Sequence, residues 1–179
     1  GSGKTTQVPQ MLLDEGIAGE KMIVILQPRR VAARTVATRV ASERKCELGA
    51  EVGYQIRFDD HTSAGTRICF VTEGILLRWL QDDRTLANIG AVIFDEFHER
   101  NLLSDVALAL VKHLQRTQRR DLLMLVMSAT LDAEPVATYL EECPILISEG
   151  QSYPVDVSYL DAPDQRAITD QAAEAVERI

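Results

Sequence analysis

Short apolar runs alternate with longer amphipathic stretches along this chain. Five runs rich in Ile, Val and Leu, each ending in a polar residue, have the pattern of strands buried on both faces; they span residues 22–27, 67–72, 91–95, 122–128 and 144–148. Between them, apolar residues recur at helical spacing over residues 31–46, 73–81, 104–118 and 135–142. This alternation predicts an α/β fold, with a mostly parallel sheet covered by helices on both faces.

The polar residues that follow the apolar runs carry the candidate chemistry. Gln-Pro-Arg-Arg follows the first run, Thr-Glu-Gly the second, Asp-Glu-Phe-His the third and Ser-Ala-Thr the fourth. A parallel sheet binds its ligands outside the carboxyl ends of its strands. We therefore expect one functional site at that edge of the sheet, assembled from segments that are far apart in the sequence.

The composition is that of one globular domain. The 179 residues include 46% hydrophobic and 26% charged residues, enough for a single substantial core. No run reaches the roughly 18 apolar residues of a membrane span, and the first residues do not form a secretory signal, so we expect a cytoplasmic protein with no membrane partner. Cys46, Cys69 and Cys143 lie far apart, which favours buried free thiols over a zinc site or disulfides.

The charge is unevenly distributed along the chain. The net charge of −8 opposes binding to nucleic acid, which is driven largely by Lys and Arg. Residues 1–60, however, carry 9 basic and 8 acidic side chains, whereas residues 61–179 carry 10 basic and 19 acidic ones. We therefore expect any surface for a polyanion to involve the first third of the chain. That third contains a cluster of four arginines: Arg29, Arg30, Arg34 and Arg39.

The chain opens with GSGKTT, which matches the end of the phosphate-loop pattern G-x-x-x-x-G-K-[ST]. Glycines at positions 1 and 3 allow backbone N–H groups to surround an anion, and a helix that begins near Lys4 presents the positive end of its dipole. The ammonium of Lys4 would then reach the β and γ phosphates of a nucleotide, and Thr5 would offer its hydroxyl to Mg²⁺. The alternative is a cloning remnant, GSG, followed by an ordinary helix.

A pair of carboxylates, Asp95 and Glu96, follows the third apolar run in the segment AVIFDEFHER. A P-loop NTPase needs one carboxylate at the tip of a buried strand to hold the Mg²⁺ shell and another to orient the attacking water. Asp95 would take the metal and Glu96 the water. The alternative is an acidic start to the next helix, which the helix dipole favours without any function. A Gly-Lys-Thr loop in the same chain favours the NTPase interpretation.

Six segments resemble, in order and at their separations, motifs I, Ia, II and III and the intervening segments of the DEAH-box branch of superfamily 2 RNA helicases: GSGKTTQVPQ, QPRRVAA, GYQIRF, VTEGILLR, DEFHER and MSAT. The resemblance covers nearly the whole chain and implies a RecA-like P-loop NTPase domain over residues 1–160. Phe97 stands where most members carry Ala, which is similar to a bacterial branch of these ATP-dependent helicases. Asp95, Glu96 and His98 remain, so this departure leaves the chemistry intact.

The resemblance implies that ATP, or another NTP, binds together with Mg²⁺. The nucleotide-binding residues would be Gly1, Ser2, Gly3, Lys4, Thr5 and Thr6. Glu96, Asp95 and Lys4 would be catalytic, and Thr5 and Asp95 would be the metal ligands.

The resemblance also assigns residues to coupling and to nucleic-acid binding. The residues that couple hydrolysis to movement would be His98, Ser128 and Thr130. A histidine just after a strand is, however, more often a structural hydrogen-bond partner than a catalyst. The contacts with single-stranded or structured RNA would come from Arg29, Arg30, Thr72 and Glu73. For a lone arginine, a solvated position or an intramolecular ion pair is the competing interpretation.

The resemblance further implies a longer protein. In the family, a strand feeds the phosphate loop, and a second RecA-like domain supplies an arginine that completes the nucleotide site. We expect this chain to be cut within the phosphate loop and to begin, over residues 161–179, the connection toward that second domain. Because loss of such an arginine lowers phosphoryl-transfer rates by several powers of ten, the fragment alone is expected to bind nucleotide weakly and to hydrolyse it slowly or not at all.

Two other function classes stay open at this point. A DNA helicase or translocase of the same superfamily would carry similar motifs I to III, and stimulation by RNA or by DNA would separate it from an RNA helicase. A nucleic-acid-binding module with a vestigial nucleotide site is the second alternative. The intact phosphate-loop residues and the intact pair of Asp95 and Glu96 argue against it, because a site without catalytic duty has no need of all of them.

Overall fold

The computed structural model describes residues 3–129, 133–141, 143–148, 154–157, 159 and 165–177. Gly1, Ser2 and Thr130, which the sequence assigns to the nucleotide site and to motif III, lie outside the described residues. The chain divides into two compact units, residues 1–149 and residues 150–179. The first unit contains the sheet, and the second contains helix α6 (Ile168–Glu177), which has no buried residue.

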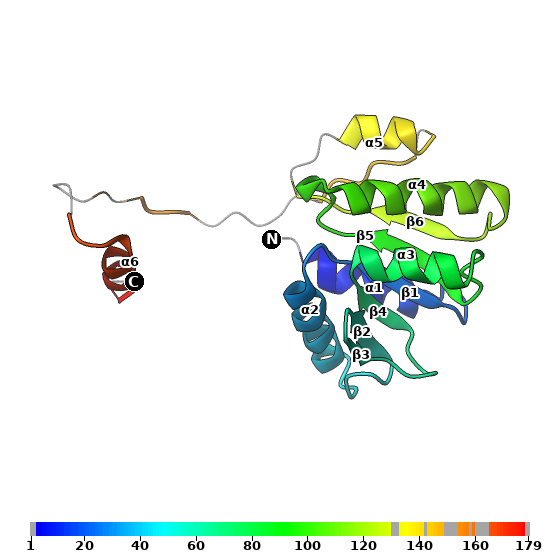
Figure 1. The fold of residues 1–179 in the computed structure, drawn as a ribbon, viewed down its shortest axis with the longest axis horizontal. Coiled ribbons are helices and arrows are strands. Elements are labelled where there is room, and N and C mark those ends of the chain that lie inside the picture. Colours follow the sequence, from blue (N-terminus) through cyan, green and yellow to red (C-terminus); the bar gives the residue numbers. More distant parts are fainter. Residues whose placement is uncertain are drawn as a thin grey trace. The chain divides into compact units, whose positions relative to one another are not determined.

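A six-stranded sheet forms the centre of the first unit, in the strand order β3-β2-β4-β1-β5-β6 (Figure 1). Its strands are β1 (Met22–Leu26), β2 (Val52–Ile56), β3 (Asp59–His61), β4 (Ile68–Val71), β5 (Ile89–Phe94) and β6 (Leu123–Val126). Every neighbouring pair is parallel except β2 and β3, which form an antiparallel hairpin. The prediction of an α/β fold with a mostly parallel sheet is confirmed.

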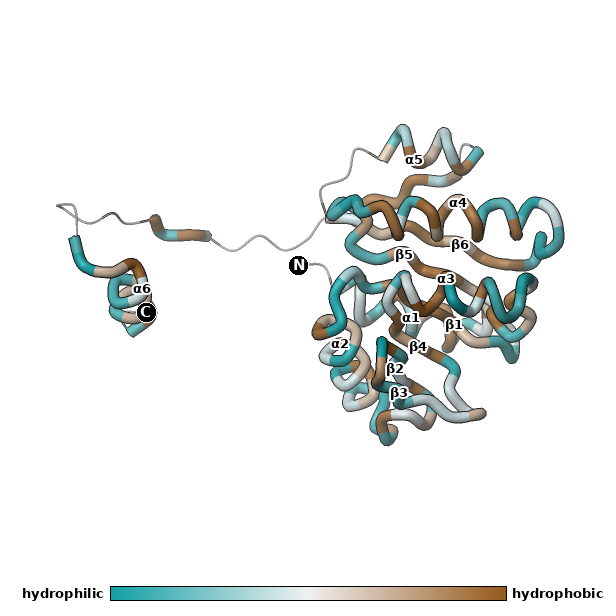
Figure 2. The backbone as a smooth tube through the Cα atoms, viewed as in Figure 1, coloured by the Kyte–Doolittle hydropathy of each residue, from teal (hydrophilic) through white to brown (hydrophobic). Residues whose placement is uncertain are grey.

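Helices cover both faces of this sheet. The described helices of the first unit are α1 (Lys4–Asp14), α2 (Arg30–Glu43), α3 (Glu73–Asp82), the 3-10 helix η1 (Phe97–Glu99), α4 (Leu102–Thr117) and α5 (Ala133–Tyr139). Successive residues of a strand point to opposite faces. Ile23 and Ile25 of β1 therefore pack with α1 and α2, whereas Val24 and Leu26 pack with α3 and α4. Figure 2 shows that the central strands consist largely of hydrophobic residues. None of the described helices is long and apolar enough to cross a membrane.

The carboxyl ends of the parallel strands are level with one another. In the strand register, Leu26 of β1 lies opposite both Val71 of β4 and Phe94 of β5, and Phe94 lies opposite Val126 of β6. The residues that follow these strands therefore share one edge of the sheet: Gln27, Thr72, Asp95 and Met127. This is the edge at which the sequence pattern places the site.

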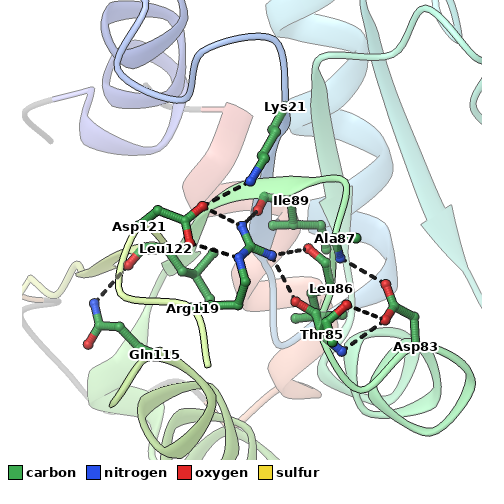
Figure 3. Close-up of polar contacts among 10 residues, drawn as sticks. All are labelled: Lys21, Asp83, Thr85, Leu86, Ala87, Ile89, Gln115, Arg119, Asp121 and Leu122. Atoms are coloured by element: carbon green, nitrogen blue, oxygen red, sulfur yellow. Dashed lines mark hydrogen bonds and ion pairs between the residues drawn. The ribbon is translucent and has the colours of Figure 1, made fainter. Parts of the chain in front are cut away.

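Arg119 holds together the opposite, amino end of the sheet (Figure 3). Its guanidinium donates at 2.6–2.8 Å to three main-chain carbonyls, those of Thr85, Leu86 and Ile89. It also donates to the carboxylate of Asp121 through two bonds of 2.9 Å, and Lys21 Nζ donates to the same carboxylate at 2.9 Å. Arg119 is only 8% exposed, and these contacts fix the loops that lead into β5 and β6.

The hairpin of β2 and β3 is an element that the apolar pattern does not predict. The sequence of β2, VGYQI, interrupts its apolar residues with Gly and Gln. Gly53 is required there because a Cβ on it would lie 2.2 Å from the backbone oxygen of His61. Tyr54 stacks on His61 with ring centroids 5.0 Å apart, and its hydroxyl donates to Asp59 at 2.9 Å. The hairpin is therefore held by close backbone approach and polar contacts.

The strand predicted over residues 144–148 is wrong. Residues 143–148 form no regular secondary structure, and Leu146 and Ile147 are 93% and 88% exposed. An extended apolar segment becomes a strand only when its backbone N–H and C=O groups pair with a neighbouring strand. No described strand pairs with this segment, so its apolar composition was insufficient evidence.

The three cysteines are free, as expected, but only Cys69 is buried. Cys69 lies inside β4, where burial raises the pKa of its thiol to about 12. Cys46 and Cys143 are partly exposed, so the prediction of burial is wrong for these two residues.

Candidate functional site

Helix α1 begins with residues that the sequence assigns to the phosphate loop. Gly3 caps the helix in the left-handed conformation, with φ 71° and ψ 13°, which glycine adopts without steric cost. Its carbonyl accepts the N–H groups of Thr6 (3.1 Å) and Gln7 (2.9 Å) and the hydroxyl of Thr6 (3.1 Å). Lys4 and Thr5 therefore occupy the first turn, where the positive end of the helix dipole favours an anion.

The carboxylate of Asp95 is buried and held by two donors. Asp95 follows β5 and is 7% exposed. Gln27 Nε2, at the end of β1, donates to Asp95 Oδ2 at 2.6 Å, and the backbone N–H of Glu96 donates to Oδ1 at 2.9 Å. Each carboxylate oxygen can accept a further ligand, so Asp95 is a fixed, oriented acceptor. Sequence reasoning missed Gln27, whose only signal was a polar residue at the end of an apolar strand.

Glu96 has a strained backbone next to this fixed carboxylate. Its φ of 50° and ψ of 34° lie in the left-handed region, which costs a non-glycine residue of the order of 1 kcal/mol and is found preferentially at functional sites. The side chain of Glu96 is 41% exposed, with Oε2 3.5 Å from His98 Nδ1. That nitrogen is buried and has no hydrogen-bond partner among the described residues, so the two groups are close without being hydrogen bonded.

The main chain after β6 lies against the main chain of motif II. The backbone N–H of Met127 donates to the carbonyl of Phe94 at 2.8 Å, and the N–H of Phe97 donates to the carbonyl of Met127 at 3.1 Å. Phe97 is 3% exposed and packs edge to face on Phe94, with ring centroids 6.3 Å apart. Ser128, predicted to couple hydrolysis to movement, therefore follows Met127, whose backbone is hydrogen bonded to the turn that carries Glu96.

Thr72 and Glu73 lie at the start of α3 and differ in their surroundings. Thr72 is the residue before the helix and makes no side-chain cap. Glu73 is 6% exposed, and its Oε1 accepts Ser104 Oγ at 2.7 Å and Asn101 Nδ2 at 3.2 Å. The Glu73 carboxylate is thus hydrogen bonded to the start of α4. What the start of α3 presents to a ligand at this edge of the sheet is therefore the backbone of its first turn.

Three of the four clustered arginines, Arg29, Arg34 and Arg39, form exposed ion pairs. Arg29 Nη2 lies 2.9 Å from Glu99 Oε1, with side chains 72% and 32% exposed. The other pairs are Arg34 with Asp59, and Arg39 with Glu43. Arg30, the first residue of α2, is exposed. Of the two arginines predicted to contact nucleic acid, Arg29 is thus in an exposed ion pair and Arg30 is exposed, and exposed pairs are weak.

A shallow hollow of about 580 Å³ lies beside these groups. Its lining comes from the turn before α2, the start of α3 and the turn between η1 and α4: Pro28, Arg29, Glu73, Glu99, Asn101, Leu102 and Leu103. The hollow therefore joins the segments that the sequence assigns to nucleic-acid binding to the segment that follows motif II.

The structure brings some of the predicted site residues into contact and not others. Asp95 and Glu96 are joined to each other, and Glu96 lies close to His98. Among the described residues, no hydrogen bond joins the hydroxyl of Thr5 to Asp95, and no group of three or more His, Cys, Asp or Glu side chains could hold a metal ion.

Comparisons with known proteins agree on one family. Residues 1–138 match the DEAD/DEAH box helicase family. The chain is 46% identical over 176 residues to the ATP-dependent RNA helicase HrpB of Escherichia coli, covering 98% of this chain and 22% of the relative. It is 46% identical over 167 residues to the human ATP-dependent RNA helicase DHX33, covering 91% of this chain and 24% of the relative. A crystal structure of the E. coli DEAH/RHA helicase HrpB superposes with a TM-score of 0.86 at 44% identity, covering 99% of this chain and 23% of that one.

Proposed function

This chain belongs to the DEAD/DEAH box helicase family, and we propose that it is the ATP-binding and ATP-hydrolysing motor domain of an ATP-dependent RNA helicase. The observation that carries the proposal is the buried Asp95 carboxylate, held by Gln27 at 2.6 Å and followed directly by the strained, exposed Glu96. A vestigial site would have no reason to keep a buried carboxylate and a strained neighbour together.

The chemical step follows from the roles of this chain's own residues. The γ-phosphate of ATP lies at the first turn of α1, where Lys4 contacts the β and γ phosphates. Glu96 accepts a hydrogen bond from the water that attacks the γ-phosphorus. The water oxygen bonds to that phosphorus while the bond from phosphorus to the bridging oxygen of ADP breaks. The water oxygen stays on inorganic phosphate, and its protons end on phosphate and in solvent.

Mg²⁺ fits the donors that this chain offers. Thr5 provides a hydroxyl and Asp95 a carboxylate, both hard oxygen donors of the kind that Mg²⁺ prefers. Mg²⁺ is commonly held by one or two carboxylates together with substrate phosphates, so the single carboxylate of Asp95 suits it. When bound, Mg²⁺ would neutralise charge on the β and γ phosphates.

We assign the nucleic-acid surface to the hollow beside motif II. Arg29 and Arg30, with the first turn of α3 that begins after Thr72, would contact backbone phosphates. Glu73 would support this surface from the interior, because its carboxylate accepts a hydrogen bond from Ser104 and so holds the start of α4 in place. RNA rather than DNA is favoured because the relatives HrpB and DHX33 are both named RNA helicases.

A second RecA-like domain would complete the motor. The relatives are about four times as long as this chain, since it spans 22–24% of their length. We propose that residues 1–160 form the ATP-binding domain, that residues 161–179 lead toward the second domain, and that an arginine of that domain completes the nucleotide site. Closure of the two domains on ATP would move the protein along RNA. The cytoplasmic location expected from the sequence stays a prediction.

ATP turnover by the full-length protein tests the proposed function. It should be measured without nucleic acid, with single-stranded RNA and with single-stranded DNA of the same sequence. Strong stimulation by RNA and weak stimulation by DNA is the expected result. Equal or greater stimulation by DNA would replace the RNA helicase with a DNA translocase. Nucleotide binding without turnover under all three conditions would favour the vestigial site.

A further inference from the structure

Two side-chain bridges connect the segment after β1 with the segment after β5. The inner one joins Gln27 to Asp95 at 2.6 Å and is buried. The outer one joins Arg29 to Glu99 at 2.9 Å and is exposed. Gln27 and Arg29 are two residues apart in sequence, so both bridges belong to one short segment. Only the outer bridge borders the hollow that we assign to nucleic acid.

The outer bridge ends on the turn that carries Glu96. The backbone N–H of Glu99 donates to the carbonyl of Glu96 at 2.9 Å and closes this turn. Positive φ angles flank it, 50° at Glu96 and 37° at Arg100, so the turn is strained at both ends. Such a conformation persists only where its surroundings hold it.

Three side chains hold this turn, and one of them reaches the hollow. Phe97 is buried in the core, and Arg100 donates twice to Asp105 of α4, at 3.1 Å and 2.9 Å. Glu99 is tied to Arg29, whose side chain is 72% exposed. Phe97 is buried, and the Arg100–Asp105 pair does not line the hollow, whereas Arg29 and Glu99 both do, so the third contact can be exchanged for a ligand there.

A phosphate in the hollow competes directly with Glu99 for the guanidinium of Arg29. An exposed ion pair is weak, because water and salt screen it. A phosphate diester presents two oxygens to the planar guanidinium and can bind it in a bidentate manner. Binding of a nucleic-acid backbone therefore favours transfer of Arg29 from Glu99 to phosphate.

We propose that the Arg29–Glu99 bridge restrains the turn of Glu96 until RNA breaks the bridge. Glu99 is then a positioning residue through which RNA stimulates ATP hydrolysis. The inference rests on the proposed function and adds its regulation. In the absence of RNA, the bridge holds the turn at Glu96–Arg100 in one fixed conformation. With RNA bound, Arg29 contacts phosphate, Glu99 is released, and the turn is free to place Glu96 against the attacking water.

The test compares Glu99→Gln and Glu99→Ala in the full-length protein with the wild type. RNA-free ATP turnover should rise about two- to fivefold and the Kd for single-stranded RNA should fall about two- to fivefold, the range that the energy of one exposed ion pair allows. Glu141→Gln is the matched control, because Glu141 forms an exposed ion pair of the same length, 2.9 Å, with Arg116. It should change neither quantity. A misfolded variant cannot mimic the expected result, which is a higher RNA-free turnover together with a higher affinity for RNA.

A double-mutant cycle separates the bridge from a general effect of removing negative charge. Arg29→Ala also breaks the bridge, so the Glu99→Gln substitution should no longer raise RNA-free turnover in the Arg29→Ala background. An equal rise in both backgrounds would overturn the proposal, as would unchanged turnover and RNA affinity in Glu99→Gln when the wild type is stimulated by RNA. A wild type that RNA does not stimulate would instead refute the proposed function itself.

Discussion

The two ends of the central sheet use their polar side chains in opposite ways. At the amino end, Arg119 is 8% exposed and donates to three carbonyls and to Asp121, so its hydrogen-bonding capacity is filled (Figure 3). At the carboxyl end, Glu96 has a left-handed backbone, and His98 has a buried nitrogen without a partner among the described residues. Filled networks stabilise a fold. The amino end also has a left-handed residue, Leu86 (φ 47°), and a buried nitrogen without a partner among the described residues, Arg67 Nε. What distinguishes the carboxyl end is that its strained residue, Glu96, carries an exposed carboxylate beside the buried one of Asp95.

Arg119→Met should give the largest loss of stability. The substitution keeps much of the apolar stem but removes the Arg119 donor from the carbonyls of Thr85, Leu86 and Ile89, of which Leu86 keeps the backbone N–H of Ile89. At about 1 kcal/mol for each hydrogen bond, the free energy of unfolding should fall by roughly 2–4 kcal/mol. Denaturant unfolding measures it. ATP turnover under stable conditions should be little changed, because the amino end has no part in the site.

The neighbouring exposed Arg120 supplies the control for this variant. Arg120→Met should change the free energy of unfolding by no more than about 0.5 kcal/mol, as exposed substitutions usually do. Equal effects of the two substitutions would show that the network at the amino end is not what stabilises the protein.

Gln27→Leu should affect both stability and function, because it lies at the carboxyl end. Leucine has a similar volume, but it leaves Asp95 Oδ2 buried without its donor. The expected cost is about 1–3 kcal/mol in the free energy of unfolding, together with a loss of ATP turnover as Asp95 loses its fixed orientation. Gln55→Leu is the control, since it removes an exposed hydrogen bond of 2.8 Å from the side-chain amide of Gln55 to the carboxylate of Asp60. A stable Gln27→Leu variant with normal turnover would contradict the role given to this bridge.

Acid titration should give the smallest effect, and it comes from the amino end. Hydrogen bonds from Arg119, and then from Lys21, lower the pKa of Asp121 in the folded protein. The ionised carboxylate therefore favours folding: its contribution is complete above about pH 4, the pKa of an unfolded aspartate, and is lost as the pH falls through the lowered pKa. The difference in unfolding free energy between wild type and Asp121→Asn should shrink as the pH falls below about 4. A difference independent of pH would contradict this.

Much of the sheet could be predicted because its parallel strands are buried on both faces. Strands β1, β4, β5 and β6 are almost uninterrupted apolar runs, so the apolar pattern located their ends to within two residues. The hairpin of β2 and β3 was missed because close backbone approach at Gly53 and polar contacts hold it. The run at 144–148 misled for the converse reason, since apolar residues alone do not supply a pairing partner.

The candidate site was predictable where it follows from strand direction, and unpredictable where it depends on long-range pairing. Asp95 was placed at the ligand-binding edge because carboxyl ends of parallel strands share one edge. Its partner Gln27 lies 68 residues away, and the partner of Arg29, Glu99, lies 70 residues away. No local pattern indicates such pairs. Glu73 was predicted to contact nucleic acid, and the burial of its carboxylate could not be foreseen because its partners are Ser104 of α4 and Asn101, the residue before that helix.

The most direct test of the account measures ATP binding and ATP turnover side by side in Glu96→Gln, with Lys4→Ala for reference. In the full-length protein with RNA present, Glu96→Gln should bind ATP as the wild type does while turnover falls by about 10²–10⁴-fold, the usual contribution of a positioned base. Lys4→Ala should lose ATP binding itself. Parallel losses of binding and turnover in Glu96→Gln would contradict the claim that the strained residue at the carboxyl end positions the attacking water.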